Sequence, residues 1–130
     1  MPSLEKYVLL VDDEEPNRVL ISHRLSREGY QVTAVAGGRA ALEALRAQRF
    51  DLVLLDLMMP EMDGLATLDA IKSDPALARI PVLMLTSSNV RASVVHCLSL
   101  GAADYLIKPV NPAELRMRLH RQLVATARIP

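Results

Sequence analysis

The segment from Asp51 to Gly64 constrains the fold more than any other part of the sequence. Its residues 52–55 are Leu-Val-Leu-Leu, a continuous apolar run without polar alternation. Such a run is typical of a strand that is covered on both faces, as in a parallel sheet between two helix layers. Pro60 and Gly64 then end the strand. We therefore expect Asp56 where the chain leaves the sheet.

Asp56 has two competing interpretations at this point. In open α/β sheets, ligands bind in the crevice beyond the carboxyl ends of the strands, so a carboxylate there can belong to a functional site. Aspartate is also a favoured cap and turn residue, so Asp56 can equally be a surface residue that caps the following helix. The residue alone favours neither interpretation.

The composition fits one globular domain. The chain has 130 residues, 51% of them apolar, which is enough to bury a single core. Its 15 Lys and Arg balance its 15 Asp and Glu, so the basic surface expected of a nucleic-acid-binding domain is missing. Cys97 is the single cysteine, which excludes an internal disulfide, and its place in an apolar helical pattern indicates a packing role. No segment approaches the length of a membrane span, so we expect a cytoplasmic protein.

Short apolar runs alternate with helical patterns along the chain. Strands are predicted at residues 7–11, 30–35, 52–56, 80–86 and 105–107. Each is followed by an amphipathic helix, and Asn111 is expected to cap the last one. The inward positions are predicted to be Leu20, Ile21, Leu25, Ala41, Leu42, Leu45, Leu65, Leu68, Ile71, Val94, Val95, Leu98, Leu115, Leu119 and Leu123. Five strands alternating with five helices predict an α/β fold with a doubly wound parallel sheet and helices on both faces.

Polar side chains follow four of the predicted strands. Asp12 and Asp13 follow the first strand, Asp56 ends the third, Thr86 ends the fourth and Lys108 follows the fifth. If these strands are parallel neighbours, the side chains meet at one edge of the sheet. Three carboxylates repel one another unless a cation joins them, and hard oxygen ligands suit Mg²⁺. A lysine and a hydroxyl beside them suit a transferred phosphoryl group. Contact with water explains any single polar strand end, but explains the whole set less well.

Four motifs together resemble the receiver domain of bacterial two-component response regulators, of which the chemotaxis receiver is one member. The resemblance extends from Val8 to about Val124. It implies a five-stranded, flavodoxin-like sheet of order 2-1-3-4-5. It also implies a receiver domain at residues 1–125 and, at residues 126–130, a C-terminal tail or an artificial end of a longer sequence. The motifs are Val8 to Glu14, Asp56 with Met59 to Gly64, Leu85-Thr86-Ser87, and Gly101 to Pro109.

The resemblance implies a role for each acidic residue. Asp56 matches the residue that accepts the phosphoryl group from a histidine kinase's phosphohistidine. Asp13, Asp56 and the backbone carbonyl of Met58 match the ligands of Mg²⁺, the one implied cofactor, and Asp12 matches a residue that usually reaches the metal through water. Lys108 matches the lysine that pairs with a phosphoryl oxygen. The domain is then a signalling phosphoacceptor rather than an enzyme, although it assists its own phosphorylation and dephosphorylation.

Thr86 and Tyr105 match the pair that switches a receiver. The Thr86 hydroxyl would move towards the phosphoryl group and the Tyr105 ring would turn into the vacated space. This would alter the surface formed by the fourth helix, fifth strand and fifth helix. An ordinary half-buried strand aromatic explains Tyr105 equally well. The resemblance also implies a cis peptide bond between Lys108 and Pro109.

The implied partners are a sensor histidine kinase or a phosphotransfer protein. An output domain in a longer chain and a second copy, bound through the fourth and fifth helices, are further partners that fit. No direct nucleic-acid or membrane partner is expected.

Three other functions compete with this interpretation. A phosphatase of the haloacid dehalogenase type needs a second acid two residues after the nucleophile, where this chain has Met58. A flavodoxin-like or nucleotide-binding module needs a glycine-rich loop after the first strand, where this chain has the four acids 12–15. A receiver fold used only for docking would not need the complete acidic set with Thr86 and Lys108.

Overall fold

The computed structural model of the chain describes residues 6–87 and 91–127. Its centre is a five-stranded sheet in the order β2-β1-β3-β4-β5, and all four strand pairs are parallel. The predicted fold class and strand order are therefore confirmed. The strands are β1 (Tyr7–Val11), β2 (Gln31–Val35), β3 (Leu52–Asp56), β4 (Val82–Thr86) and β5 (Asp104–Ile107).

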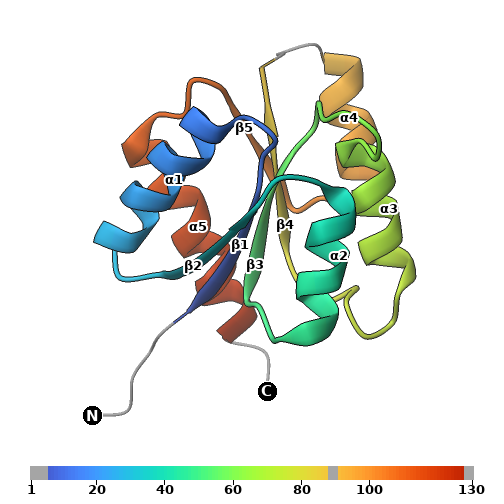
Figure 1. Cartoon of the computed structure of the whole chain (residues 1–130), viewed down its shortest axis with the longest axis horizontal. Helices are drawn as coiled ribbons and strands as arrows, with labels where there is room; N and C mark the ends of the chain where they lie inside the picture. The colour runs from blue at the N-terminus through green and yellow to red at the C-terminus, as the bar shows by residue number, and fades with distance from the viewer. Residues whose placement is uncertain (1–5, 88–90, 128–130) are drawn as a thin grey trace.

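Helices cover both faces of the sheet, with α1 and α5 on one face and α2, α3 and α4 on the other (Figure 1). This arrangement explains the unalternated apolar run of β3. Leu52 and Leu54 pack with side chains of α1 and α5, whereas Val53 and Leu55 pack against the opposite layer, and all four are fully buried. The helices are α1 (Glu15–Arg27), α2 (Gly38–Ala47), α3 (Gly64–Ser73), α4 (Arg91–Ser99) and α5 (Pro112–Ala127). In the described residues, none of them combines the length and apolar character needed to cross a membrane.

Three strand boundaries differ from the prediction by one or two residues. The N–H of Tyr30 donates to the carbonyl of Leu25, so Tyr30 belongs to the turn that ends α1. The carbonyl of Ile80 accepts from Lys72 Nζ at 2.8 Å, and the backbone N–H of Ile80 donates to Leu77, so this residue also lies in a turn. Because these backbone groups are already bonded locally, β2 and β4 begin later than expected. β5 begins one residue earlier, at Asp104.

The inward faces of α1 and α4 were partly predicted wrongly. Leu20, Val95 and Leu98 are 49%, 55% and 42% exposed. In α4 the contact with the core is made by buried Cys97, which confirms its packing role. Successive helical residues are about 100° apart, so Val95 and Leu98 cannot share the face of Cys97. The other predicted inward residues are buried or half-buried.

Two helices begin at side-chain caps. Asn111 Oδ1 accepts from the N–H groups of Ala113 and Glu114, at 2.9 and 3.1 Å, so the predicted cap of α5 is confirmed. Asp63 Oδ1 accepts from the N–H of Ala66 at 2.8 Å and caps α3. The interpretation of Asp56 as the cap of that helix is therefore wrong.

Gly64 is required where α3 approaches the end of β3. A Cβ at Gly64 would overlap the carbonyl oxygen of Asp56 and would lie 2.6 Å from the Cα of Leu57. Since these are backbone atoms, a side-chain rotation cannot relieve the overlap. We predict that Gly64→Ser lowers the free energy of unfolding, measured by urea titration, by about 1–3 kcal/mol.

Gly37→Ser is the matched control. A Cβ at Gly37 meets no atom within 4 Å, its φ of −167° suits any residue, and serine is a good N-cap for α2. We expect its free energy of unfolding to change by less than about 0.5 kcal/mol. Equal losses in the two variants would contradict the close-approach argument.

Candidate functional site

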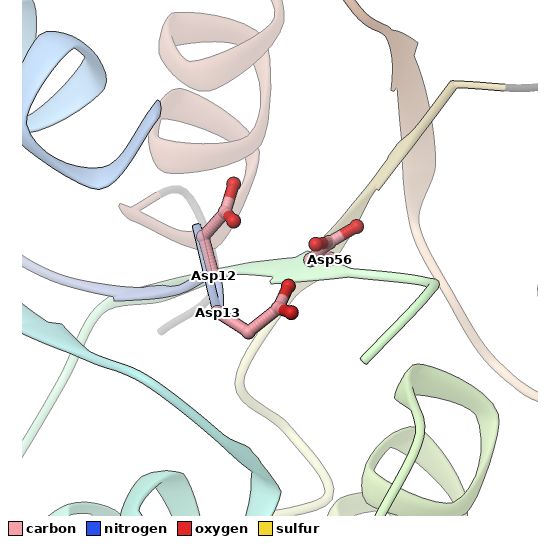
Figure 2. Close-up of side chains that lie close together, drawn as sticks. All are labelled: Asp12, Asp13 and Asp56. Atoms are coloured by element: carbon pink, nitrogen blue, oxygen red, sulfur yellow. The ribbon is translucent and has the colours of Figure 1, made fainter. Parts of the chain in front are cut away.

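The parallel strand order brings three carboxylates to one edge of the sheet. Asp12 and Asp13 follow β1, and Asp56 is the last residue of the neighbouring strand β3. One carboxylate oxygen of each residue lies within 4.8 Å of the other two, and Figure 2 shows Asp13 reaching towards Asp56. Asp12 and Asp56 are almost fully buried, whereas Asp13 is half-buried. The predicted meeting of these carboxylates is therefore found in the structure.

Lys108 supplies the positive charge of this cluster. Its Nζ lies 3.1 Å from Asp12 Oδ2 and 3.2 Å from Asp56 Oδ2, and 3.9 Å from Oε1 of Glu14. The backbone N–H of Lys108 donates to the carbonyl of Thr86 at 2.8 Å, which fixes the residue beside the end of β4. The peptide bond that follows Lys108 is cis, as expected. One ammonium is thus shared by two buried carboxylates.

Backbone hydrogen bonds orient the two buried carboxylates. Asp12 Oδ1 accepts from the N–H of Glu14 at 2.9 Å, and Asp56 Oδ1 accepts from the N–H of Met58 at a longer 3.3 Å. Arg18 donates to the backbone carbonyl of Asp12 at 2.8 Å. The buried Oδ2 of Asp12 is paired with the ammonium of Lys108. Each buried carboxylate therefore keeps one oxygen directed at the cationic centre of the cluster.

Burial raises the pKa of Asp56 from an ordinary value of 3.8 to about 6. The Lys108 ammonium lowers the pKa of Asp56, and the negative charge of Asp12 raises it further. Burial alone would lower the pKa of Lys108, but its contacts with Asp12 and Asp56 outweigh burial and raise that pKa. Lys108 therefore stays charged at neutral pH. Asp56 is largely ionised there, at a cost in free energy that a second cation would reduce.

The donor set fits a hard divalent cation. Three carboxylates within reach of one another offer anionic oxygen ligands, the kind that Mg²⁺ and Ca²⁺ prefer. Two of them are buried beside a single ammonium, so the cluster carries excess negative charge. The Met58 side chain is 70% exposed, and its backbone N–H donates to Asp56 Oδ1. The expected role of its carbonyl as a ligand stays a prediction.

Thr86 and Tyr105 lie on β4 and β5, the last two strands of the sheet. Thr86 is buried at the end of β4, and Tyr105 is half-buried on β5. The Arg118 guanidinium lies 5.8 Å from the centroid of the Tyr105 ring. Arg118 also forms ion pairs with Asp104 at 2.6 Å and with Glu114 at 3.0 Å. The Tyr105 ring therefore has a defined cationic neighbour on α5.

Two charged residues at or beside the site, Glu14 and Arg118, have no role predicted from the sequence. Glu14 directly follows Asp13, but nothing in the sequence indicates that its side chain turns towards Lys108. Arg118 could have been found in part, because its spacing of four residues from Glu114 is typical of an ion pair on a helix. Its contacts with Asp104 and Tyr105 depend on how α5 packs against β5.

The chain matches one known protein family over most of its length. The family model described as response regulator receiver domain matches residues 8–120. The two-component response regulator ORR7 of Oryza sativa subsp. japonica is 41% identical over 118 residues, which is 90% of this chain and 56% of ORR7. The chain thus spans little more than half the length of this relative.

Two solved structures are similar over nearly their whole length. The chemotaxis protein CheY4 of Vibrio cholerae has a TM-score of 0.86 and 35% identity, covering 90% of this chain and 98% of that one. The receiver domain of the sensor histidine kinase PA1611 of Pseudomonas aeruginosa PAO1 has a TM-score of 0.85 and 34% identity, covering 92% and 98%. That structure holds a magnesium ion in its active site cleft.

The raised pKa of Asp56 predicts a specific pH dependence of stability. Between pH 4 and 6 the folded state binds a proton at Asp56 that the unfolded state has released, so stability falls as the pH rises through this window. In EDTA at pH 7, Asp56→Asn should therefore raise the free energy of unfolding by about 1–3 kcal/mol relative to the wild type. Urea titrations at pH 4 and pH 7 test this expectation.

Mg²⁺ provides the second arm of the same experiment. An ion held by Asp56 binds the folded state preferentially, so saturating Mg²⁺ at pH 7 should raise the stability of the wild type more than that of Asp56→Asn. A difference between the two proteins that is the same at both pH values and with Mg²⁺ would contradict the electrostatic account.

Proposed function

The chain belongs to the family of response regulator receiver domains, and we propose that Asp56 is its phosphoacceptor. The resemblance drawn from the sequence motifs is thereby confirmed. The single observation that supports Asp56 is its position at the carboxyl end of the central strand β3. There it lies 3.2 Å from Lys108 and within reach of two further carboxylates.

The proposed reaction is transfer of a phosphoryl group from a phosphohistidine to Asp56. A carboxylate oxygen of Asp56 attacks phosphorus, the phosphorus–nitrogen bond breaks, and its electron pair leaves with the imidazole nitrogen. With a pKa of about 6, Asp56 is mainly in the nucleophilic, ionised form at neutral pH. Lys108 neutralises charge on a phosphoryl oxygen, and the Thr86 hydroxyl is a second partner for that group.

Asp12, Asp13 and Asp56 are the residues that would hold Mg²⁺, with the Met58 carbonyl as a further ligand and Asp12 acting through water. Bound there, the ion would offset the negative charge of the phosphoryl group. The three clustered carboxylates support this assignment, as does the magnesium in the related PA1611 receiver. The domain would assist its own phosphorylation and dephosphorylation with these groups, and it turns over no separate substrate.

The proposed output of phosphorylation is a change on the surface of α4, β5 and α5. Thr86 would move towards the phosphoryl group and Tyr105 would turn inward, away from its contact with Arg118. The buried position of Thr86 and the half-buried position of Tyr105 support this proposal.

We further propose a cytoplasmic phosphorelay, with a sensor histidine kinase or phosphotransfer protein as donor. The changed surface of α4, β5 and α5 would be recognised by a partner protein, by a second copy of the chain or by an output domain of a longer chain. The receiver itself would be residues 1–125.

The phosphoacceptor proposal is tested by intact mass after incubation with Mg²⁺ and acetyl phosphate. We expect one phosphoryl adduct on the wild type that is labile in base, because it is an acyl phosphate. Asp56→Ala should carry none. Absence of an adduct together with absence of Mg²⁺ binding would favour a docking module that keeps the fold without the chemistry.

The switch is tested by the environment of the Tyr105 ring. We expect beryllium fluoride with Mg²⁺, a mimic of the phosphoryl group, to change the ring's ¹³C shifts and to remove its contacts with Arg118. Thr86→Val should still bind the mimic, because Asp56 and Lys108 remain, but should leave the ring unchanged. A ring that keeps its contacts with Arg118 in the wild-type complex would overturn the switch and leave the phosphoacceptor proposal intact.

A further inference from the structure

Glu14 places a fourth carboxylate on the solvent-exposed side of the site, beside Lys108. Its Oε1 lies 3.9 Å from Lys108 Nζ, beyond the closer contacts of that ammonium with Asp12 and Asp56. The Glu14 side chain is 62% exposed, whereas that of Lys108 is 14% exposed. Glu14 is therefore the solvent-facing carboxylate of the cluster.

Two hydrogen bonds hold Glu14 in this place. Its backbone N–H donates to Asp12 Oδ1 at 2.9 Å, which ties the residue to the buried part of the site. Its Oε1 accepts from Asn17 Nδ2 at 3.1 Å, so the first turn of α1 restrains the carboxylate itself. A charge restrained beside Lys108 acts on any group that approaches this ammonium.

We propose that Glu14 selects among phosphodonors by charge, disfavouring acyl phosphates relative to phosphoramidates. The proposal rests on the proposed function of Asp56 and names the class of donor that this site prefers. Acetyl phosphate is a dianion at neutral pH. Phosphoramidate, whose nitrogen is protonated, carries one negative charge fewer. An exposed anionic group beside Lys108 repels the first donor more strongly than the second.

The two donors differ in the bond that breaks and in the leaving group. With acetyl phosphate, an Asp56 oxygen bonds to phosphorus, the phosphorus–oxygen bond to the acetyl group breaks, and acetate leaves with the electron pair. With phosphoramidate, the phosphorus–nitrogen bond breaks and the protonated nitrogen leaves as ammonia. The second reaction breaks the same kind of bond as transfer from a phosphohistidine. Phosphoramidate is therefore the model for a phosphohistidine in the bond that breaks, while the charge of the donor is what Glu14 would sense. Because Glu14 repels the dianionic acyl phosphate more strongly, it would favour phosphoramidate-type donors over small acyl phosphates.

The test compares the rate of adduct formation with the two donors, at saturating Mg²⁺ and low ionic strength. In water, one unit charge several ångströms away changes a rate by about two- to threefold for each charge on the donor. Glu14→Gln should therefore raise the rate about three- to tenfold with acetyl phosphate and about two- to threefold with phosphoramidate. In 1 M salt, where screening is nearly complete, the ratio of the two rates in the wild type should rise to that of Glu14→Gln, because salt then cancels the effect of the Glu14 charge.

Two further variants separate charge from structure. Glu14→Asp keeps the charge, so its donor ratio should stay close to that of the wild type. Glu43→Gln removes one charge from an exposed position of α2 and should leave the ratio unchanged.

An unchanged donor ratio in Glu14→Gln, with both donors still forming the adduct, would overturn this inference alone. A ratio that shifts only below saturating Mg²⁺ would also overturn it, since Glu14 would then act through metal affinity. If neither donor formed an adduct on the wild type, the proposed function would be overturned, and the donor selection with it.

Discussion

The ammonium of Lys108, shared between Asp12 and Asp56, is the interaction on which the site depends. Both carboxylates are buried, and a buried charge without a partner is costly enough to unfold part of a small domain. Lys108 comes from the far edge of the sheet, directly after β5, so its contact with two inner strands ties three strand ends together. The parallel order of the sheet makes this contact possible, because it directs the carboxyl ends of β1, β3 and β5 to one edge.

One ammonium does not neutralise the three carboxylates of the site, which therefore keeps a net negative charge. This excess charge is what allows the site to bind a further cation. Burial and the charge of Asp12 keep the pKa of Asp56 raised in spite of the lysine. A fully neutralised cluster would be more stable, but it would have little affinity for a further cation and a phosphoryl group. The cost in stability is tolerable because the surrounding core is apolar and fully buried on both faces of β3. Natural domains commonly accept such a cost where a site must bind or react.

Periodicity and local rules predicted most of the fold, because each β-α unit carries its own signals. The apolar run at 52–55 predicted a strand covered on both faces, and the polar strand ends predicted the acidic edge. The strand order came from resemblance to a family, since periodicity alone does not distinguish one parallel order from another. Short apolar stretches such as α4 fit more than one helical face, which is why Val95 was placed inward while Cys97 makes the contact. The directions of the Glu14 and Arg118 side chains depend on tertiary packing and had no signal of comparable strength.

The site and the proposed output surface are directly connected, because β5 carries Tyr105 and leads into Lys108. Lys108 directly follows β5, and its N–H is bonded to the carbonyl of Thr86 at the end of β4. Tyr105 lies on β5 three residues before Lys108, beside the guanidinium of Arg118 on α5. A phosphoryl group that engaged both Lys108 and Thr86 would therefore act directly on the last two strands of the sheet. The proposed switch needs no longer pathway, because Tyr105 lies on β5, Lys108 directly follows that strand, and a backbone hydrogen bond joins Lys108 to Thr86.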